Sequence, residues 1–350
     1  MKIELDIDST ALGDSGCIRK LFMTVAGSVV ENRVVGGFKE LPSASIIYGV
    51  AVHKFIDTMY KTGGHYPTAR KDAELAFNVP KRAPSANQGH LGDPTHMITT
   101  CYNLWTNKIE EEYDFGVIKV PIKCYHCKGT GTVQGGNNDG KQCDKCGGCG
   151  IVKGPATEIT FKLPFYEDDV VKINLCGTID RVGQYKGGCF AIRDWKTSSQ
   201  FKQDKYLSSY EMNRQLRIYT LACKMMAAKE PDSILGRIGA TRMGANIDAI
   251  FIKPKANDNQ YGSTEVFTYD DNDLLEVKAM IFDQCRQLSI AARVGKWNEI
   301  PRTGLINGTC DGKWGKCKFW NVCKNPHNVG EMLLARDFKR KLYNPLAFNE

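Results

Sequence analysis

Two aspartates and one lysine stand close together in residues 172–196, a stretch that alternates apolar and polar residues like two strands joined by a turn at 186–188. Asp180 ends the first predicted strand, and Asp194 and Lys196 come late in the second. Residues two apart on a strand share a face, so Asp194 and Lys196 point the same way. Neighbouring carboxylates repel each other unless a cation lies between them. The spacing therefore predicts a divalent-cation site beside a fixed ammonium group.

The Asp-x-Lys tripeptide by itself also fits a surface ion pair at a strand end, because it arises by chance about once in a chain of this length. Other positions add to it. A helix is predicted over residues 42–60, and His53 on it is either a packed core histidine or a metal ligand. Gln215 and Tyr219 are four residues apart on a second predicted helix and share its face.

A first group of cysteines has the spacing of a zinc site. The chain has fourteen cysteines but no apolar leader in its first ten residues, MKIELDIDST, so we expect a cytoplasmic protein in which disulfides are rare. Two Cys-x-x-Cys pairs, each able to give two thiolates to one tetrahedral Zn²⁺, are separated by 15 residues. The predicted zinc ligands are Cys124, Cys127, Cys143 and Cys146, with Cys149 as a bystander or alternative ligand.

A second group, Cys310, Cys317 and Cys323, lies near the C-terminus. Three thiolates are one short of a closed site, and Cys17, far away in sequence, is the natural fourth ligand. An iron–sulfur cluster on these four cysteines would join the first helix to the end of the chain and close a very long loop. Zinc with a histidine such as His327, or plain core packing, remain alternatives.

The periodicity of apolar residues and the capping residues predict the helices and strands that must position these side chains. Ser43 or Ser45 is the expected N-cap of helix 42–60. Residues 61–94, rich in Gly, Pro and polar residues, are expected to form a long irregular connection. Strands flank the first cysteine group, which should therefore project from the tip of a hairpin. Residues 9–26 are predicted to form a cap followed by a short helix that starts at or near Cys17. We also predict helices at 95–113, 207–229 and 271–295, strands at 115–122 and 157–165, and a strand pair within 247–269.

Composition bounds the class of protein. The chain has 350 residues, is 42% hydrophobic and 25% charged, and has no run of 18 apolar residues, so we expect a globular protein without a membrane span. The formal charge of +8 suits a polyanionic partner. Trp314, Phe319 and Trp320 either stack on the bases of a single strand or pack around the second cysteine group.

Together these motifs resemble one family, the RecB-type exonucleases of the PD-(D/E)XK nuclease superfamily, in the branch that carries an iron–sulfur cluster and includes CRISPR-associated and phage-encoded members. The resemblance extends over most of the chain. It is carried by GVAVHKFID with His53, GTIDRV with Asp180, DWKTS with Asp194 and Lys196, QLRIY with Gln215 and Tyr219, and by Cys17, Cys310, Cys317 and Cys323. The first gap in the C-terminal cysteine trio is longer than in many members. The hairpin cysteines, in CYHCKGTG and CDKCGGCG, are similar to the cysteine-rich region of DnaJ-type chaperones over about 30 residues.

The resemblance implies a restriction-endonuclease-like α/β (α+β) fold, with a central mixed sheet flanked by helices, an inserted zinc hairpin and a C-terminal iron–sulfur staple. It implies a [4Fe-4S] cluster on Cys17 and the C-terminal trio. It also implies Mg²⁺ or Mn²⁺ in the active site. The implied catalytic residues are Lys196, Asp180, Asp194, Gln215 and Tyr219, and the implied ligands of Mg²⁺ or Mn²⁺ are His53, Asp180, Asp194 and the backbone carbonyl of Trp195.

The expected function is a metal-dependent DNA exonuclease in recombination, repair or replication, acting on single strands or DNA ends. It would pair with a helicase or recombination protein or form a homo-oligomer. Alternatives are a non-catalytic DNA-binding protein that recruits partners on a nuclease fold, and a metal-stapled interaction protein related to chaperone zinc domains. The expected parts are an N-terminal helical part at 1–120, the zinc insertion at 121–156, the nuclease core at 157–295, and the iron–sulfur region with a basic tail at 296–350.

Overall fold

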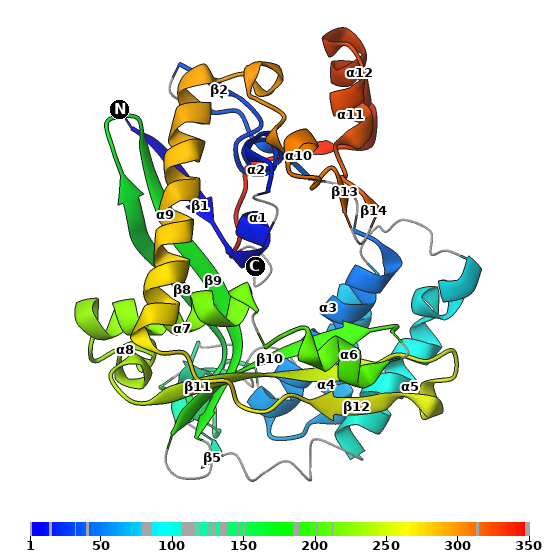
Figure 1. Cartoon of the computed structure of the whole chain (residues 1–350). Helices are drawn as coiled ribbons and strands as arrows, with labels where there is room; N and C mark the ends of the chain where they lie inside the picture. Colours follow the sequence, from blue (N-terminus) through cyan, green and yellow to red (C-terminus); the bar gives the residue numbers. More distant parts are fainter. Residues whose placement is uncertain are drawn as a thin grey trace.

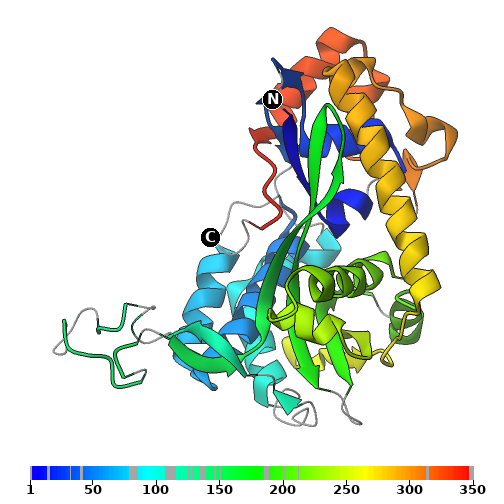
Figure 2. The same ribbon diagram turned by 90° about the vertical axis from the view of Figure 1, so that its left-hand side faces the viewer.

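The computed structural model describes most of the chain, and Figures 1 and 2 show it from two directions. The turn at 186–188, Cys146 and Trp314 lie outside the described residues. Within the described part, no helix is long and apolar enough to cross a membrane. The described residues are 2–346 except 14–15, 32, 40–41, 79–85, 107–115, 118, 125–126, 128–129, 134–138, 146, 150, 185–188, 201, 212 and 313–314.

A central antiparallel hairpin carries the two aspartates, as predicted. It consists of β9 (Val171–Gln184) and β10 (Phe190–Ser198). The strand β9 continues four residues beyond Asp180, so the prediction that Asp180 ends its strand was wrong. Going away from the turn, the last paired residues of the two strands are Arg193 and Arg181, and the next residue on each strand is one of the two aspartates. Their side chains therefore lie where the two strands begin to separate.

This hairpin is the middle of a mixed seven-stranded sheet in the described part of the chain, with the order β1-β9-β10-β11-β12 and with β5 and β8 also paired to β9. The pairs β1–β9 and β10–β11 are parallel, and the others are antiparallel. The predicted fold class, a central mixed sheet flanked by helices, is confirmed. The other strands are β1 (Ile3–Ile7), β5 (Gly116–Val117), β8 (Thr157–Glu167), β11 (Met243–Phe251) and β12 (Gln260–Ser263).

Helices cover both faces of the sheet because the strands alternate between two apolar cores. Ile192 and Phe251 face a core shared with α7 and α9, whereas Trp195 and Ile250 face a second core shared with α3, α4 and α5. Figure 1 shows α9 crossing one side of the sheet and the α3–α5 group at the other. The helices are α3 (Ala44–Thr62), α4 (Tyr66–Phe77), α5 (Pro94–Leu104), α6 (Gln203–Ser208), α7 (Arg214–Lys229), α8 (Ile234–Gly239) and α9 (Asp271–Val294), with 3-10 turns η1 (Ala86–Gly92) and η4 (Ala256–Asp258).

The predictions for residues 61–94 and 207–229 need correction. Residues 61–94 are not simply irregular, because α4 begins there with a proline in its first turn and buries Ala69, Ala73 and Phe77 at four-residue spacing. The helix predicted at 207–229 is two helices. Asn213 caps the second, accepting hydrogen bonds from the backbone of Gln215 at 2.8 Å and Leu216 at 3.3 Å, so α7 begins at Arg214.

An N-terminal and a C-terminal segment of the chain pack together, with α2 beside α10 in Figure 1. The backbone N–H of Ile18 donates to Thr303 Oγ1 at 3.1 Å, and Asn307 Nδ2 donates to the Gly16 carbonyl at 3.0 Å. The elements of this region are α1 (Ser9–Gly13), α2 (Ile18–Val25), β2 (Val29–Val30), β3 (Arg33–Val34), β4 (Gly37–Lys39), η5 (Trp297–Glu299), α10 (Thr303–Ile306), β13 (Asp311–Gly312), β14 (Gly315–Lys316), α11 (Trp320–Lys324), α12 (His327–Asp337) and β15 (Lys339–Lys341).

The first cysteine group lies beyond a two-stranded stalk. The strands β6 (Lys119–Lys123) and β7 (Ile151–Pro155) pair antiparallel, with Lys123 opposite Ile151. Cys124 follows directly, so the group lies at the tip of a hairpin, as predicted. Figure 2 shows the segment beyond the stalk reaching away from the rest of the molecule.

Candidate active site and metal centres

The helix α3 brings His53 to the end of the central hairpin. Ser43 caps the helix by accepting a hydrogen bond from the backbone of Ile46 at 3.3 Å. Gly49 allows close packing against β10, because a Cβ at this position would lie 2.7 Å from Thr197 Oγ1. One turn later, His53 Nδ1 lies 3.4 Å from Asp180 Oδ2.

The imidazole of His53 is neutral at neutral pH. Burial, and to a smaller extent the nearby ammonium of Lys196, lower its pKa to about 4, against the opposing effects of Asp194 and the Trp195 backbone. The contact with Asp180 is therefore not an ion pair. A neutral imidazole is the form that binds a metal ion.

Asp180 is held by the backbone of the neighbouring strand. Its Oδ2 accepts a hydrogen bond from the N–H of Trp195 at 2.7 Å. Burial raises the pKa of Asp180 to about 6, although Lys196 and the Trp195 hydrogen bond both lower it. Loss of hydration on burial therefore outweighs the neighbouring ammonium group in setting this pKa.

Asp194 is almost fully buried and has partners from two elements. Lys196 forms an ion pair with its Oδ2, and Gln215 Nε2 donates to its Oδ1 at 3.1 Å. The same Gln215 amide nitrogen lies 2.8 Å from the Tyr219 hydroxyl. Burial and the charge of Asp180 raise the pKa of Asp194 to about 6 against the opposing effect of Lys196. Burial alone would lower the pKa of Lys196, but Asp194 and Asp180 raise it, so the amine stays charged.

The structure thus brings His53, Asp180, Asp194 and Lys196 together, with Gln215 and Tyr219 behind Asp194. Two oxygen donors and one neutral nitrogen donor suit Mg²⁺ or Mn²⁺. The two raised carboxylate pKa values fit a site that is completed by a cation, since one ammonium does not balance two buried carboxylates.

The sequence analysis missed one acidic residue, Glu158 on β8. It lines the same small pocket as His53 and Asp180. Its φ of 49° lies in the left-handed region, which is unusual for a non-glycine residue. Burial raises its pKa to about 8, and the charges of Asp180 and Asp57 add to this effect. Strand alternation over 157–165 did not reveal it, because only the pairing of β8 with β9 brings it near Asp180.

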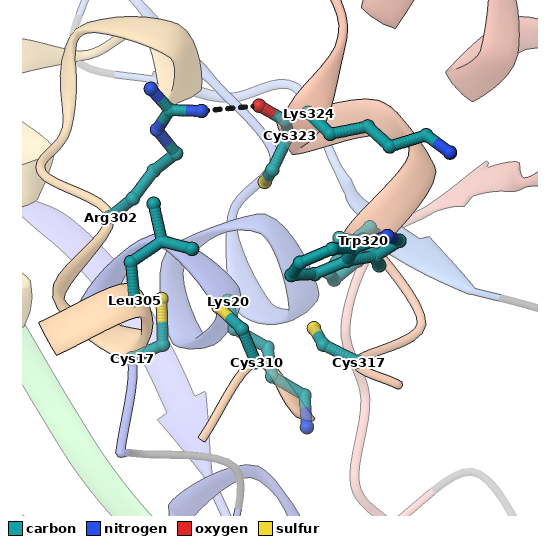
Figure 3. Close-up of a pocket in the computed structure, with 10 residues that line it drawn as sticks. Cys17, Lys20, Arg302, Leu305, Cys310, Cys317, Trp320, Cys323 and Lys324 are labelled. Carbon is teal, nitrogen blue, oxygen red and sulfur yellow. Dashed lines mark hydrogen bonds between the residues drawn. The ribbon is translucent and has the colours of Figure 1, made fainter. Parts of the chain in front are cut away.

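The second cysteine group surrounds a cavity of about 80 Å³. Figure 3 shows the sulfur atoms of Cys17, Cys310, Cys317 and Cys323 directed into a shared space. Cys17 is the N-cap of α2, and its thiol makes no capping hydrogen bond. Gly304 has room for no side chain, because a Cβ there would lie 2.9 Å from both the Cys17 Cβ and the Cys310 Sγ.

Arg19 links α2 to the segment at 298–300 beside this cysteine group, and the sequence analysis gave it no role. Its Nε donates to the Ile300 carbonyl at 2.7 Å and its Nη2 to the Asn298 carbonyl at 3.0 Å. The guanidinium also lies 5.7 Å from the ring centre of Trp297 and hydrogen-bonds Cys323, which lowers the pKa of that thiol against the larger effect of burial. The position of Arg19 two residues after Cys17 was the available signal.

The hairpin cysteines form a tighter group. The ligand atoms of Cys124, Cys127 and Cys143 all lie within 4.8 Å of one another, and all three residues are buried. Cys124 Sγ and Cys143 Sγ are 3.8 Å apart. Tetrahedral zinc with Zn–S bonds of about 2.3 Å separates its sulfur ligands by about 3.8 Å, so the spacing fits a single zinc ion.

Comparison with known proteins gives one family match. The matching family model is described as the PD-(D/E)XK nuclease superfamily and covers residues 17–324. No curated protein is similar enough in sequence to count as a relative. A solved structure from Eubacterium rectale, named only as a candidate exonuclease, aligns over 93% of this chain and 91% of its own at 12% identity and a TM-score of 0.39. That TM-score is too low to support an inference about activity.

Proposed function

This chain belongs to the PD-(D/E)XK nuclease superfamily, and from that premise we propose that it is a Mg²⁺- or Mn²⁺-dependent DNA exonuclease. Its substrates would be single strands or DNA ends in recombination, repair or replication. The observation that carries the proposal is the convergence of Asp180, Asp194, Lys196 and a neutral His53 at the point where β9 and β10 separate.

In this proposal His53, Asp180, Asp194 and the Trp195 carbonyl hold the catalytic cation. The nearness of His53 to the Trp195 backbone supports this set, because it places the imidazole at that part of β10. When bound, the cation polarises the phosphodiester and lowers the pKa of a water molecule. Lys196 keeps its proton and offsets the negative charge that develops on the phosphate. Gln215 holds the Asp194 carboxylate in place.

We further propose that the two cysteine groups bind different metals. The hairpin sulfurs are spaced for one zinc ion, for which Cys146 would be the fourth ligand. Cys17, Cys310, Cys317 and Cys323 surround a cavity. Among the described residues, their sulfur atoms do not all lie within 4.8 Å of one another, whereas those of Cys124, Cys127 and Cys143 do. That wider arrangement supports a [4Fe-4S] cluster over a single ion.

The test is cleavage of end-labelled single- and double-stranded DNA by purified protein with Mg²⁺, Mn²⁺ or excess EDTA. Asp194→Ala should lower the cleavage rate by more than about 1,000-fold, since it removes a ligand and the partner of Lys196. Glu265→Ala, which removes an exposed carboxylate, serves as the matched control and should keep wild-type activity. Thermal unfolding of both variants checks that they are folded.

Cleavage by Asp194→Ala at the wild-type rate would refute the assignment. DNA binding by wild-type protein with no cleavage under either metal would favour the non-catalytic alternative, a nuclease fold kept to hold DNA. Ladders of shortened products indicate an exonuclease, whereas internal fragments of a closed circle would contradict that part of the proposal.

A further inference from the structure

Three lysines share one face of a small two-stranded ribbon made by distant parts of the chain. The strands β4 and β15 pair antiparallel, and Lys39 lies directly opposite Lys339. Side chains alternate along a strand, so Lys339 and Lys341 share the face of Lys39, while Arg340 lies on the other. All three lysines are exposed. We call this face the lysine ribbon.

The lysine ribbon concentrates like charge. Like charges directly opposite each other on paired strands destabilise the pair. The register places Lys341 two residues along the ribbon from the partner of Lys39, and burial and the charge of Lys341 both lower the pKa of Lys39. Within the described residues, neither Lys339 nor Lys341 forms an ion pair with a carboxylate. A bound polyanion would remove this repulsion.

The opposite face fixes the ribbon to the second cysteine group. The Arg340 guanidinium lies 5.0 Å from the ring centre of Phe38. Phe38 contacts Phe338 edge-on at 6.4 Å, and Phe338 stacks on Phe319 at 4.9 Å. Phe319 lines the cysteine cavity. The backbone that carries the lysines is therefore packed through aromatic contacts against the second cysteine group.

We propose that the lysine ribbon binds the phosphate backbone of the DNA substrate outside the catalytic cluster. This inference rests on the proposed nuclease function. Ammonium groups act as point charges and lack the planar fork that reads base edges, so the contact would be independent of sequence. Residues two apart on a strand are separated by about 6.6 Å, so Lys339 and Lys341 can reach different phosphates.

The experiment uses Asp194→Ala as a full-length, non-cleaving parent and measures Kd for an end-labelled DNA duplex at several salt concentrations. Adding K339Q and K341Q should reduce the slope of log K against log salt by about 1.8, since each phosphate contact contributes about 0.9. The matched control adds K229Q and K278Q, which remove the same charge from exposed sites on α7 and α9. Adding K339R and K341R instead should keep the parent's slope.

Equal slopes for the ribbon variant and its control would overturn the ribbon proposal and leave the proposed nuclease function intact. If the parent does not bind DNA at any salt concentration while wild-type protein does not cleave it, the proposed function fails and the ribbon proposal fails with it. Thermal midpoints that match the parent's show that the substitutions leave the β4–β15 pair folded.

Discussion

At the scale of single residues, the proposed active site holds more negative than positive charge. Asp194 is buried and Asp180 is partly buried, both lie beside one ammonium group, and both have a pKa raised to about 6. His53 cannot supply a second positive charge, since burial holds its pKa near 4. The cluster is therefore costly to fold without a cation at neutral pH, as expected for residues arranged for binding rather than for stability.

Asp180→Asn should make the metal-free protein more stable at pH 7. The folded pKa of Asp180 is above the ordinary aspartate value of 3.8, so the folded state binds the proton more tightly than the unfolded chain. Its ionised form is a cost above about pH 6, and the cost disappears as pH falls below about 4. An amide oxygen can still accept from the Trp195 N–H. We expect a gain of about 1–3 kcal/mol at pH 7 in urea unfolding with EDTA, shrinking towards pH 4.

A gain that grows as pH falls would contradict this account of Asp180. Glu265→Gln, which neutralises an exposed carboxylate, should show little difference at either pH. Addition of Mn²⁺ at pH 7 should raise the stability of the wild-type protein more than that of Asp180→Asn, because a ligand stabilises the state that binds it.

At the scale of elements, a local feature determines where each helix near a site begins, and packing then determines where that helix lies. The Ser43 cap starts α3, and close contact at Gly49 sets its distance from β10. The helix α2 begins at Cys17, and Arg19 in its first turn spans to the segment at 298–300. The Arg19 guanidinium, which donates to two backbone carbonyls, thus adds to the Ile18 and Asn307 hydrogen bonds that hold Cys17 beside the C-terminal cysteines.

Arg19→Met should destabilise the fold by about 2–4 kcal/mol, because the Ile300 and Asn298 carbonyls lose their donor in a buried site. Arg19→Lys should lie between wild type and Arg19→Met, since one ammonium cannot reproduce the planar fork. Urea unfolding gives both values. Arg237→Met on the exposed side of α8 is the control and should change stability by less than about 0.5 kcal/mol. An equally small change in stability for Arg19→Met would mean that the Arg19 hydrogen bonds do not stabilise the fold.

At the scale of the whole molecule, two metal-binding units do different work in the proposed arrangement. The second cysteine group joins residues near position 17 to residues 310–323, so it closes most of the chain into one loop. The hairpin group closes only a short segment at the end of the β6–β7 stalk. Loss of the metal from the group that contains Cys17 should therefore destabilise the whole fold, whereas loss of the hairpin metal should affect only the hairpin.

Cys317→Ser and Cys127→Ser test this division. Wild-type protein purified without oxygen should be brown and contain iron, sulfide and one zinc per chain. Cys317→Ser should lose the colour and iron and unfold at a lower temperature. Cys127→Ser should lose the zinc, keep the colour, and cut short DNA at the wild-type rate. Metal analysis, absorbance and thermal unfolding provide the readouts. Colourless wild-type protein with two zinc ions per chain would contradict the iron–sulfur assignment.

Sequence patterns predicted the sheet hairpin and the helices that carry His53 and Gln215, because alternation and capping are local properties. They failed over residues 61–94, where proline and glycine suggested a loop but α4 buries Ala69, Ala73 and Phe77 against its neighbours. They also merged α6 and α7, since the periodicity over 207–229 did not register the Asn213 cap. Sequence patterns did not predict roles for Glu158 and Arg19, because the residues that they contact lie on other helices and strands.

The sequence by itself determined the chemical groups and the family: the spacing of Asp194 and Lys196, the paired Cys-x-x-Cys motifs, and the order of motifs over residues 17–324. Only the tertiary structure decided which groups share one environment. The separation of β9 and β10 lets Asp180 reach the Trp195 N–H, and burial there sets the charge of His53, Asp180 and Asp194. Side-chain identity is local, but pKa and proximity depend on desolvation and on neighbours that folding brings from distant parts of the chain.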